Sequence, residues 1–161
     1  MSVTTDIYDL IEAAILDVLP GAKQLNNPYF PEEDAVLSYD TGYGITFGDG
    51  SGSEDTSGIG QSVASRTFTI IQTKRKFATA RDKAASVTTA KDLMDDWTLF
   101  KNKIEGDATL GNHNIVKKAF YVSDSGIEFL TLDKKRNSIL MISTVIQVNY
   151  HESVGINGNG C

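Results

Sequence analysis

The sequence predicts an α+β fold in which two helices pack on a mixed, largely antiparallel sheet of about five strands, in the order α-β-β-α-β-β-β. Three observations lead to this class. Two segments carry apolar residues at helical spacing, one long segment near the C-terminus alternates with a period of two, and the segments before it are joined by short turns. With 161 residues the chain is long enough for one domain with a core, which we place at residues 1–152.

The first helix is predicted at residues 5–19, where acidic side chains take the face opposite an apolar stripe. The stripe consists of Ile7, Leu10, Ile11, Ala14, Ile15 and Val18. Thr4 or Thr5 is placed to cap the helix, and Pro20 with Gly21 ends it. One apolar face of this width predicts that the helix lies on a sheet.

A loop is predicted at residues 21–34, because prolines and asparagines break any regular pattern there. Tyr29 and Phe30 lie in this loop, and they either plug the core or contact a neighbouring molecule. Residues 35–48 predict a strand, since aromatic and β-branched residues alternate in its second half.

Residues 48–62 contain five glycines and four serines, which leave little to bury and predict a flexible loop, either a protruding contact arm or a disordered segment. This loop is not a phosphate-binding loop, because no Gly-Lys-Ser/Thr closes it. It is not a dinucleotide-binding turn, because a strand follows it. Asp49 begins a calcium-like pattern, but Glu54 and Gly60 stand where that pattern needs Gly and Glu.

A second strand is predicted at residues 63–78, and the three basic residues 74–76 end it. Because adjacent residues of a strand point to opposite faces, these three bases form no continuous groove for nucleic acid. We interpret them as a solvated strand end.

Residues 79–106 are predicted to be mostly helical, with the main helix beginning at Thr88 or Thr89. Its buried stripe consists of Leu93, Trp97, Phe100 and Ile104. We interpret Trp97, the only tryptophan, as a core anchor rather than a binding-site aromatic. The carboxylates at 95–96 lie off the stripe and are interpreted as part of a solvated face.

The last part of the chain predicts a three-stranded antiparallel meander. Its strands are placed at residues 115–122, 127–132 and 138–151, and turns at 124–126 and 133–137 join them. The first half of the long last strand is apolar on both faces, which predicts a central strand covered twice. Its second half alternates, so that one face meets water or a partner. Residues 153–161 are predicted to form a flexible C-terminal tail.

Charge is distributed unevenly along the chain. Residues 1–62 carry eleven Asp and Glu against one Lys, a net charge of −10, whereas residues 63–161 carry fourteen Lys and Arg against ten Asp and Glu, a net charge of +4. One interpretation is chance scatter over a solvated surface. The other is a molecule with an acidic and a basic side that stacks head to tail with its own copies. The overall charge of −6 argues against a primary role in gripping DNA.

The sequence nominates no catalytic, cofactor-binding or metal-ligating residue. His113 and His151 are the only histidines, and neither has a second ligand at metal spacing. Cys161 is the only cysteine, so it forms no internal disulfide, and we interpret it as a bystander in a reducing compartment. No apolar run is long enough for a membrane span, and no secretory signal begins the chain. We therefore expect no enzyme, no cofactor and no membrane partner.

The order of elements resembles the tail terminator (tail-completion) proteins of long-tailed bacteriophages. The resemblance covers about residues 5–152 and concerns layout and texture rather than a diagnostic motif. It depends on the acidic first helix DIYDLIEAAILDVL, the strand RTFTIIQT, the helix DLMDDWTLFKNKI and the closing strand ILMISTVIQVNYHE. The Gly/Ser loop and the Gly/Asn tail depart from that layout.

The resemblance implies a virion protein at the tail–neck junction, assembled in the bacterial host cytoplasm. Such a protein forms a hexameric ring that caps the tail tube, meets a neck or head-completion protein on its other side, and lets DNA pass through its lumen. The family has no catalytic residues to carry over. Two alternatives stay open, namely another neck or tail-tube component of a phage particle, and a monomeric ligand-binding α+β domain.

Overall fold

The computed structural model describes residues 2–29, 41–53, 61–75, 83–129 and 139–153. The α+β class is confirmed, with two helices on one mixed five-stranded sheet. The elements in chain order are α1 (Val3–Val18), β1 (Lys23–Gln24), β2 (Thr41–Ser53), β3 (Gln61–Arg75), α2 (Lys83–Gly106), β4 (Val116–Phe129) and β5 (Ile139–Ser153). The predicted order of elements is wrong, because three strands separate the helices and two follow them.

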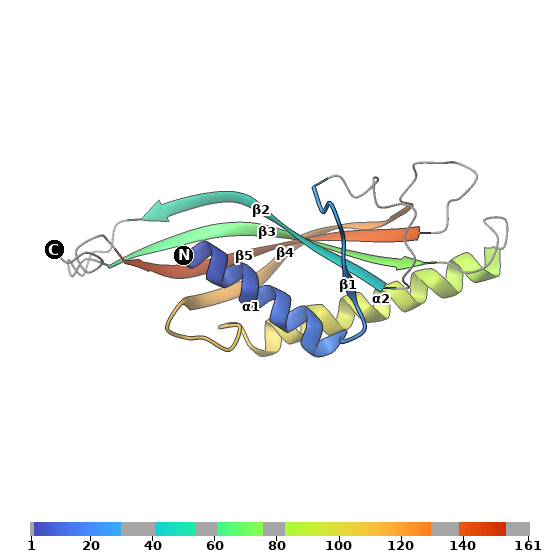
Figure 1. The fold of residues 1–161 in the computed structure, drawn as a ribbon, viewed down its shortest axis with the longest axis horizontal. Coiled ribbons are helices and arrows are strands. Elements are labelled where there is room, and N and C mark those ends of the chain that lie inside the picture. The colour runs from blue at the N-terminus through green and yellow to red at the C-terminus, as the bar shows by residue number, and fades with distance from the viewer. Residues whose placement is uncertain (1, 30–40, 54–60, 76–82, 130–138, 154–161) are drawn as a thin grey trace.

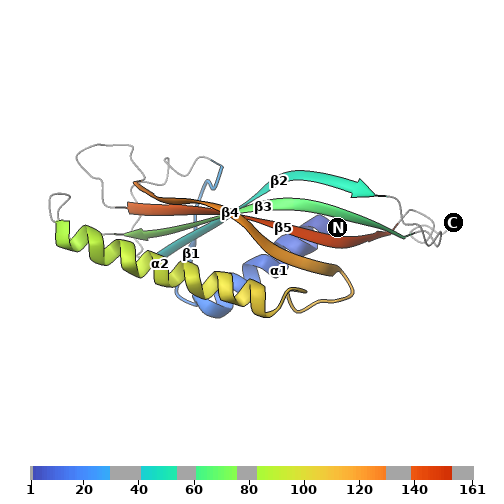
Figure 2. The ribbon, with the colours of Figure 1, turned by 180° about the vertical axis from the view of Figure 1, so that it is seen from behind.

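The sheet has the strand order β1-β2-β3-β5-β4, so β5 lies between β3 and β4. β1 pairs with β2 in parallel, and the other three pairings are antiparallel. Both helices lie on the same side of the twisted sheet (Figure 1), and Figure 2 shows this arrangement from behind. The ends of β2, β3 and β5 project beyond the first residues of α1.

Burial along β5 confirms the predicted alternation of this strand. Every second residue, from Leu140 through Ile146 to Tyr150, is buried under the helices. On the opposite face Ile139 is buried, but Met141 and the alternate residues that follow it are partly exposed. The prediction that the first half of this strand is covered twice is therefore wrong beyond Ile139, because both helices pack on one face.

Helix α1 begins earlier than the sequence predicts. Ser2 is its N-cap residue, and the Ser2 hydroxyl accepts a hydrogen bond from the Thr5 backbone N–H at 3.3 Å, so the predicted cap at Thr4 or Thr5 is wrong. The buried residues of the helix belong to the predicted stripe and pack on the sheet; they are Ile7, Ile11, Ala14 and Ile15.

Helix α2 also begins before the predicted residues Thr88 and Thr89, and Thr89 is buried within it. Leu93, Phe100 and Ile104 are buried as predicted. Trp97 faces the sheet but is only partly buried, so it lies at the rim of the core rather than in its centre. Its indole Nε1 donates a hydrogen bond of 2.9 Å to the hydroxyl of Thr144, which is buried.

A double-mutant cycle tests the Trp97–Thr144 hydrogen bond. We expect Trp97→Phe and Thr144→Val each to lower the free energy of unfolding by about 1–2 kcal/mol, because each leaves a partner unpaired in a desolvated place. The double variant should cost less than the sum of the two by about 1 kcal/mol. Urea denaturation measures all three values, and strict additivity would mean that this hydrogen bond contributes nothing.

Strand β4 replaces two predicted strands and the turn between them. Its pairing with β5 shifts register three times, and the last shift lies between Asp124 and Ile127, where the turn was expected. The Asp124 carboxylate accepts hydrogen bonds from the Tyr121 hydroxyl at 2.6 Å and from the Gly126 N–H at 2.8 Å. Gly126 has a φ of 70°, which glycine adopts without strain. The turn signal therefore marks a β-bulge, and no three-strand meander forms.

Both boundaries of the loop predicted at residues 48–62 are wrong. β2 continues to Ser53 and β3 begins at Gln61, so most of the Gly/Ser segment forms a hairpin arm. Gly48 allows a close approach of the strands, because a Cβ there would collide with the Thr67 hydroxyl and lie 3.0 Å from the Thr67 carbonyl oxygen. A Cβ at Gly50 would lie 2.6 Å from the Arg66 guanidinium, which would have to move. Residues 54–60 lie outside the described residues.

Several other sequence predictions also concern residues that the structure does not describe. These are Phe30, the first part of the strand predicted at 35–48, Lys76, the turn at 133–137, the tail from residue 154 onward and Cys161.

Candidate assembly surfaces

No cluster of titratable side chains in the described ranges is arranged for metal binding. His113 is exposed in the loop after α2, and His151 is partly buried on β5. Asp49 and Ser51, the start of the calcium-like pattern, lie on β2, where the Ser51 hydroxyl bonds to Ser65 at 2.8 Å. The candidate functional regions are therefore the surfaces that the sheet and helices present.

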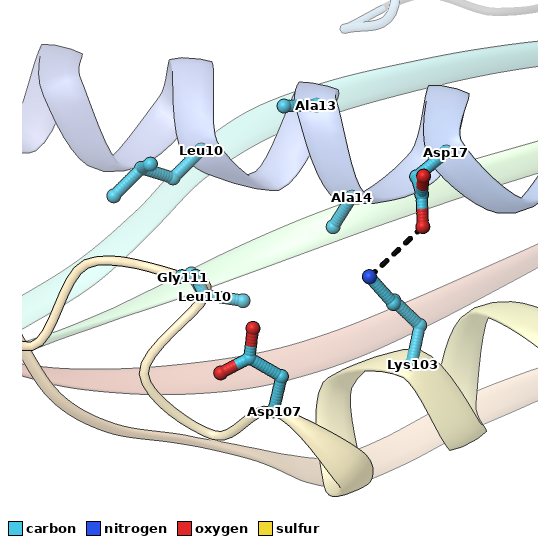
Figure 3. Close-up of a pocket in the computed structure, with 8 residues that line it drawn as sticks. All are labelled: Leu10, Ala13, Ala14, Asp17, Lys103, Asp107, Leu110 and Gly111. Carbon is cyan, nitrogen blue, oxygen red and sulfur yellow. Dashed lines mark ion pairs between the residues drawn. The ribbon is translucent and has the colours of Figure 1, made fainter.

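A hollow of about 230 Å³ lies between the C-terminal halves of the two helices (Figure 3). Lys103 of α2 forms an ion pair of 2.9 Å with Asp17 of α1 across it, and Asp107 lies on its α2 side. The hydrogen bond to Asp17 raises the pKa of Lys103. The Asp17 side chain is largely exposed, so this ion pair links the helices weakly and forms no enclosed ligand site.

Within the described residues, the outer edge of β2 pairs with another strand over a short stretch only. Among the described residues, β2 pairs on this side only with β1, at Gly42 and Tyr43. The Tyr43 carbonyl accepts from the Leu25 N–H at 2.8 Å, and the Phe47 N–H donates to the Tyr29 hydroxyl at 3.2 Å. Because alternate residues of an edge strand present their backbone outward, Ile45 between them has the same orientation. Among the described residues, strand pairing on this side of β2 is therefore limited to two residues, and single hydrogen bonds from Leu25 and Tyr29 hold the chain near it.

Aromatic and acidic side chains flank this edge. The rings of Tyr8 on α1 and Phe47 on β2 stack with centroids 5.5 Å apart, and Phe47 is 41% exposed. Tyr29 is 57% exposed, so the plug interpretation is wrong for Tyr29, and its exposure favours a contact with a neighbour. Asp9 and Glu12 lie close enough to raise the pKa of Tyr8, after burial, the main cause. We call Tyr8, Asp9, Glu12, Tyr29 and Phe47 the acidic corner.

Glu12 is held in the acidic corner by Tyr43. The buried Tyr43 hydroxyl donates a hydrogen bond of 3.0 Å to a Glu12 carboxylate oxygen. Burial, with a further contribution from this carboxylate, raises the pKa of Tyr43 to about 12.

The raised pKa of Tyr43 gives a pH-dependent stability. The folded state holds the phenol proton more tightly than the unfolded state, whose pKa is about 10. This contribution is therefore fully present below about pH 10 and is lost as the pH rises toward about 12. We expect Tyr43→Phe to flatten the stability curve in that window, as measured by urea denaturation. An unchanged slope would contradict the assignment.

At the other edge of the sheet, which β4 forms, a lysine of α2 lies among aromatic side chains. The Lys101 ammonium of α2 lies 5.6 Å from the Trp97 ring centroid and 5.1 Å from that of Tyr121 on β4. The two rings meet edge to face at 5.9 Å. Val122, next to Tyr121, is 47% exposed. We call Trp97, Lys101, Tyr121 and Val122 the lysine corner.

Other charges surround the lysine corner. Lys101 also forms an ion pair of 3.2 Å with Glu105, one turn later on α2. The hydrogen bond from Tyr121 lowers the pKa of Asp124 and raises that of Tyr121. The exposed side chains of Lys117 and Lys118 at the start of β4 add positive charge nearby.

The backbone edge of β4 differs from that of β2. Three register shifts interrupt β4, and the Ala119 N–H donates to the Ala108 carbonyl of the preceding loop at 2.6 Å. Bulges and covering loops of this kind block pairing with another strand. The two edges of the sheet therefore differ in the side chains that flank them and in how often the strand register is interrupted.

The predictions made for the charged residues at 74–76 and 95–96 are only partly right. Lys74 forms an ion pair of 3.0 Å with Asp96, which ties the end of β3 to α2, so neither is purely solvated. Asp95 is exposed as predicted. Sequence analysis did not single out Tyr8 or Lys101. An aromatic residue on the polar face of an amphipathic helix was the signal available for Tyr8, whereas only the fold brings Lys101 to Tyr121.

Comparison with known proteins identifies no family for this chain. No family model and no curated protein matches the sequence. Among solved structures, one similar chain comes from a structure titled "Virion of native gene transfer agent (GTA) particle", with a TM-score of 0.46 and 12% identity over 94% of this chain and 92% of that chain. No described helix is long and apolar enough to cross a membrane. A likeness at that TM-score assigns no function to this chain.

Proposed function

We propose that this chain is a structural protein of a phage-like particle, and more specifically a tail terminator that forms a hexameric ring. The observation that carries the proposal is the pair of unlike sheet edges, one flanked by the carboxylates of Asp9 and Glu12 and one bulged with a lysine among aromatic rings. A contact between two different patches of identical subunits is heterologous, and it closes into a ring when the rotation allows.

The sequence resemblance supplies the finer role. The acidic first helix and the long closing strand, on which the resemblance depends, form α1 and β5 of the structure. In this role the ring caps the tail tube, offers its other side to a neck or head-completion protein, and surrounds the passing DNA. We propose no enzymatic activity and place the protein in the virion at the tail–neck junction, after assembly in the host cytoplasm. The virion named by the structural neighbour belongs to the same broad class, but that likeness adds no weight.

A deletion in the particle-producing strain tests this role. A cap stops growth because one side mimics the next tube ring while the other side binds no further tube protein. Without it, we expect tubes of uncontrolled length and heads that stay unjoined, both visible by negative-stain electron microscopy. Purified protein added to growing tubes should arrest them at one end.

The outcomes separate the candidate roles. Tails of normal length that attach normally to heads would overturn the terminator proposal. Normal tail length with a failure only of joining would instead assign the protein to the neck. Re-expression of the wild-type chain is the control that should restore normal length and joining.

A further inference from the structure

We infer that the acidic corner of one copy docks on the lysine corner of a second copy, and that this contact joins neighbouring subunits of the ring. The inference rests on the proposed function in that it specifies the ring interface, and its test does not use phage tails.

Strand register places the two corners at one level of the sheet. Phe47 on β2 pairs with Phe68 on β3, Phe68 pairs with Ile146 on β5, and Ile146 pairs with Tyr121 on β4. One row of residues therefore runs across the sheet from the acidic corner to the lysine corner. A second copy displaced along this row meets the first without any shift along the strands, as a flat ring requires.

Both corners also lie on the same face of the sheet. Phe47 stacks on Tyr8 of α1, and Tyr121 contacts Trp97 of α2, and both helices cover one face. The side chains of Phe47 and Tyr121 consequently project from matching positions of the layered molecule. In neighbouring copies related by rotation about a ring axis, the acidic corner of one copy can therefore meet the lysine corner of the next.

The chemistry of the two corners is complementary. Lys101 brings a cation that already rests on aromatic rings, and the acidic corner offers the stacked rings of Tyr8 and Phe47 beside two carboxylates. An ammonium binds favourably over an aromatic face and beside a carboxylate. Lys23 is the only cation within residues 1–62, so little positive charge opposes the contact from the acidic side.

Contacts between two acidic corners are disfavoured. Two acidic corners would place the carboxylates of Asp9 and Glu12 against each other, which is unfavourable. Direct pairing of β4 with the outer edge of β2 is restricted by the Ala108 contact and the bulges. The contact is therefore expected to be made by side chains, and to be head to tail.

Charge reversal on each corner tests the inference. Asp9 is exposed and Lys101 is partly exposed, so Asp9→Lys and Lys101→Glu should leave the fold intact, as thermal unfolding can verify. Alone, each variant places like charges against each other, and we expect the apparent dissociation constant of the ring to rise by about tenfold or more. Sedimentation velocity measures it. The matched controls Asp95→Lys and Lys91→Glu reverse exposed charges of α2 outside both corners and should assemble like the wild type.

Mixing the two variants gives the decisive result. Every contact between unlike variants joins either Asp9 to Lys101, as in the wild type, or a lysine at 9 to a glutamate at 101. Equal amounts should therefore restore rings of strictly alternating subunits, which mass spectrometry of intact rings identifies. Wild-type assembly of either variant alone, or a mixture no better than its components, overturns the inference.

A protein that stays monomeric in dilute solution requires a second measurement. Asp9→Cys and Val122→Cys in a Cys161→Ser background place one thiol at each corner. At about 1 mM protein, where even a weak contact is populated, oxidation should give a ladder of linked subunits from the double variant and dimers at most from the single ones. No ladder overturns the inference. If rings form in spite of these substitutions, the proposed contact is wrong and the proposed function is unaffected. If the deletion strain makes normal tails, the proposed function is wrong and the proposed contact is unaffected.

Discussion

Phe68→Ala is expected to lower the free energy of unfolding by about 3–5 kcal/mol, the largest effect of any single change considered for this protein. Phe68 is 0% exposed in the middle of β3. It belongs to the buried cluster that joins α1 to the sheet, together with Ile11 and Ile146. Truncation removes the contacts of the phenyl group and leaves a cavity. The neighbouring strands cannot close this cavity, because their hydrogen bonds fix their positions.

Urea denaturation followed by circular dichroism measures this loss. Thr69→Ala is the matched control, because Thr69 is the next residue of the same strand and its partly exposed side chain lies on the face without helices. The control should change the free energy of unfolding by about 0.5 kcal/mol or less. A loss below about 1 kcal/mol for Phe68→Ala would contradict the position of α1 on β3.

Gln72→Met is expected to stabilise the protein by about 1–3 kcal/mol. Gln72 lies on the helix-covered face of β3 and is 1% exposed, and neither its side-chain nitrogen nor its oxygen has a hydrogen-bond partner among the described residues. An amide buried in this way keeps the full cost of its desolvation. Methionine has a similar shape and no such cost.

Gln147→Met is the control for the Gln72 prediction. Gln147 lies on the partly exposed face, where its amide nitrogen donates a hydrogen bond of 3.0 Å to Asn149, so this change should be close to neutral. Thermal unfolding of both variants against the wild type compares them. A Gln72→Met protein that is less stable than the wild type would show that the amide of Gln72 is paired in solution.

The helices and the long strands were largely predictable, because their signal is local. The periodicity of α1 and β5 depends on which residues face one core, and each has a continuous stripe of apolar side chains. The order of strands was not predictable in the same way. The turn residues from Asp124 to Gly126 are equally typical of a turn and of a bulge, and only pairing with β5 decides between them.

The prediction of a loop for the Gly/Ser segment at residues 48–62 failed for a different reason. Glycine and serine have low strand propensity, so the composition of this segment predicts a loop. In the structure, the missing side chain at Gly50 makes room for Arg66, whose guanidinium donates a hydrogen bond of 2.7 Å to the Gly48 carbonyl. The partner of these glycines lies on the neighbouring strand, and local propensity contains no information about it.

The candidate surfaces were predictable only in outline. The uneven charge of the two parts of the chain favoured an acidic and a basic side, which stays a prediction, and the residues of the acidic corner all come from the first 62 residues. The lysine corner combines Lys101 of α2 with Tyr121 of β4, which a loop separates in sequence. Such combinations follow from topology, which a single sequence specifies only through its global fold.

The central pairing of β3 with β5 has a consequence for how the chain reaches its fold. This pairing runs from Gln61 opposite Ser153 to Arg75 opposite Ile139, and α2 and β4 lie between the two strands in sequence. Contacts between such distant residues close slowly, because the loss of chain entropy precedes the gain from pairing. During synthesis β3 therefore has no inner neighbour until the ribosome has released β5. Until that moment an apolar strand edge around Phe68 stays open to other nascent chains, so the yield of folded protein should depend on chaperones that bind extended apolar segments.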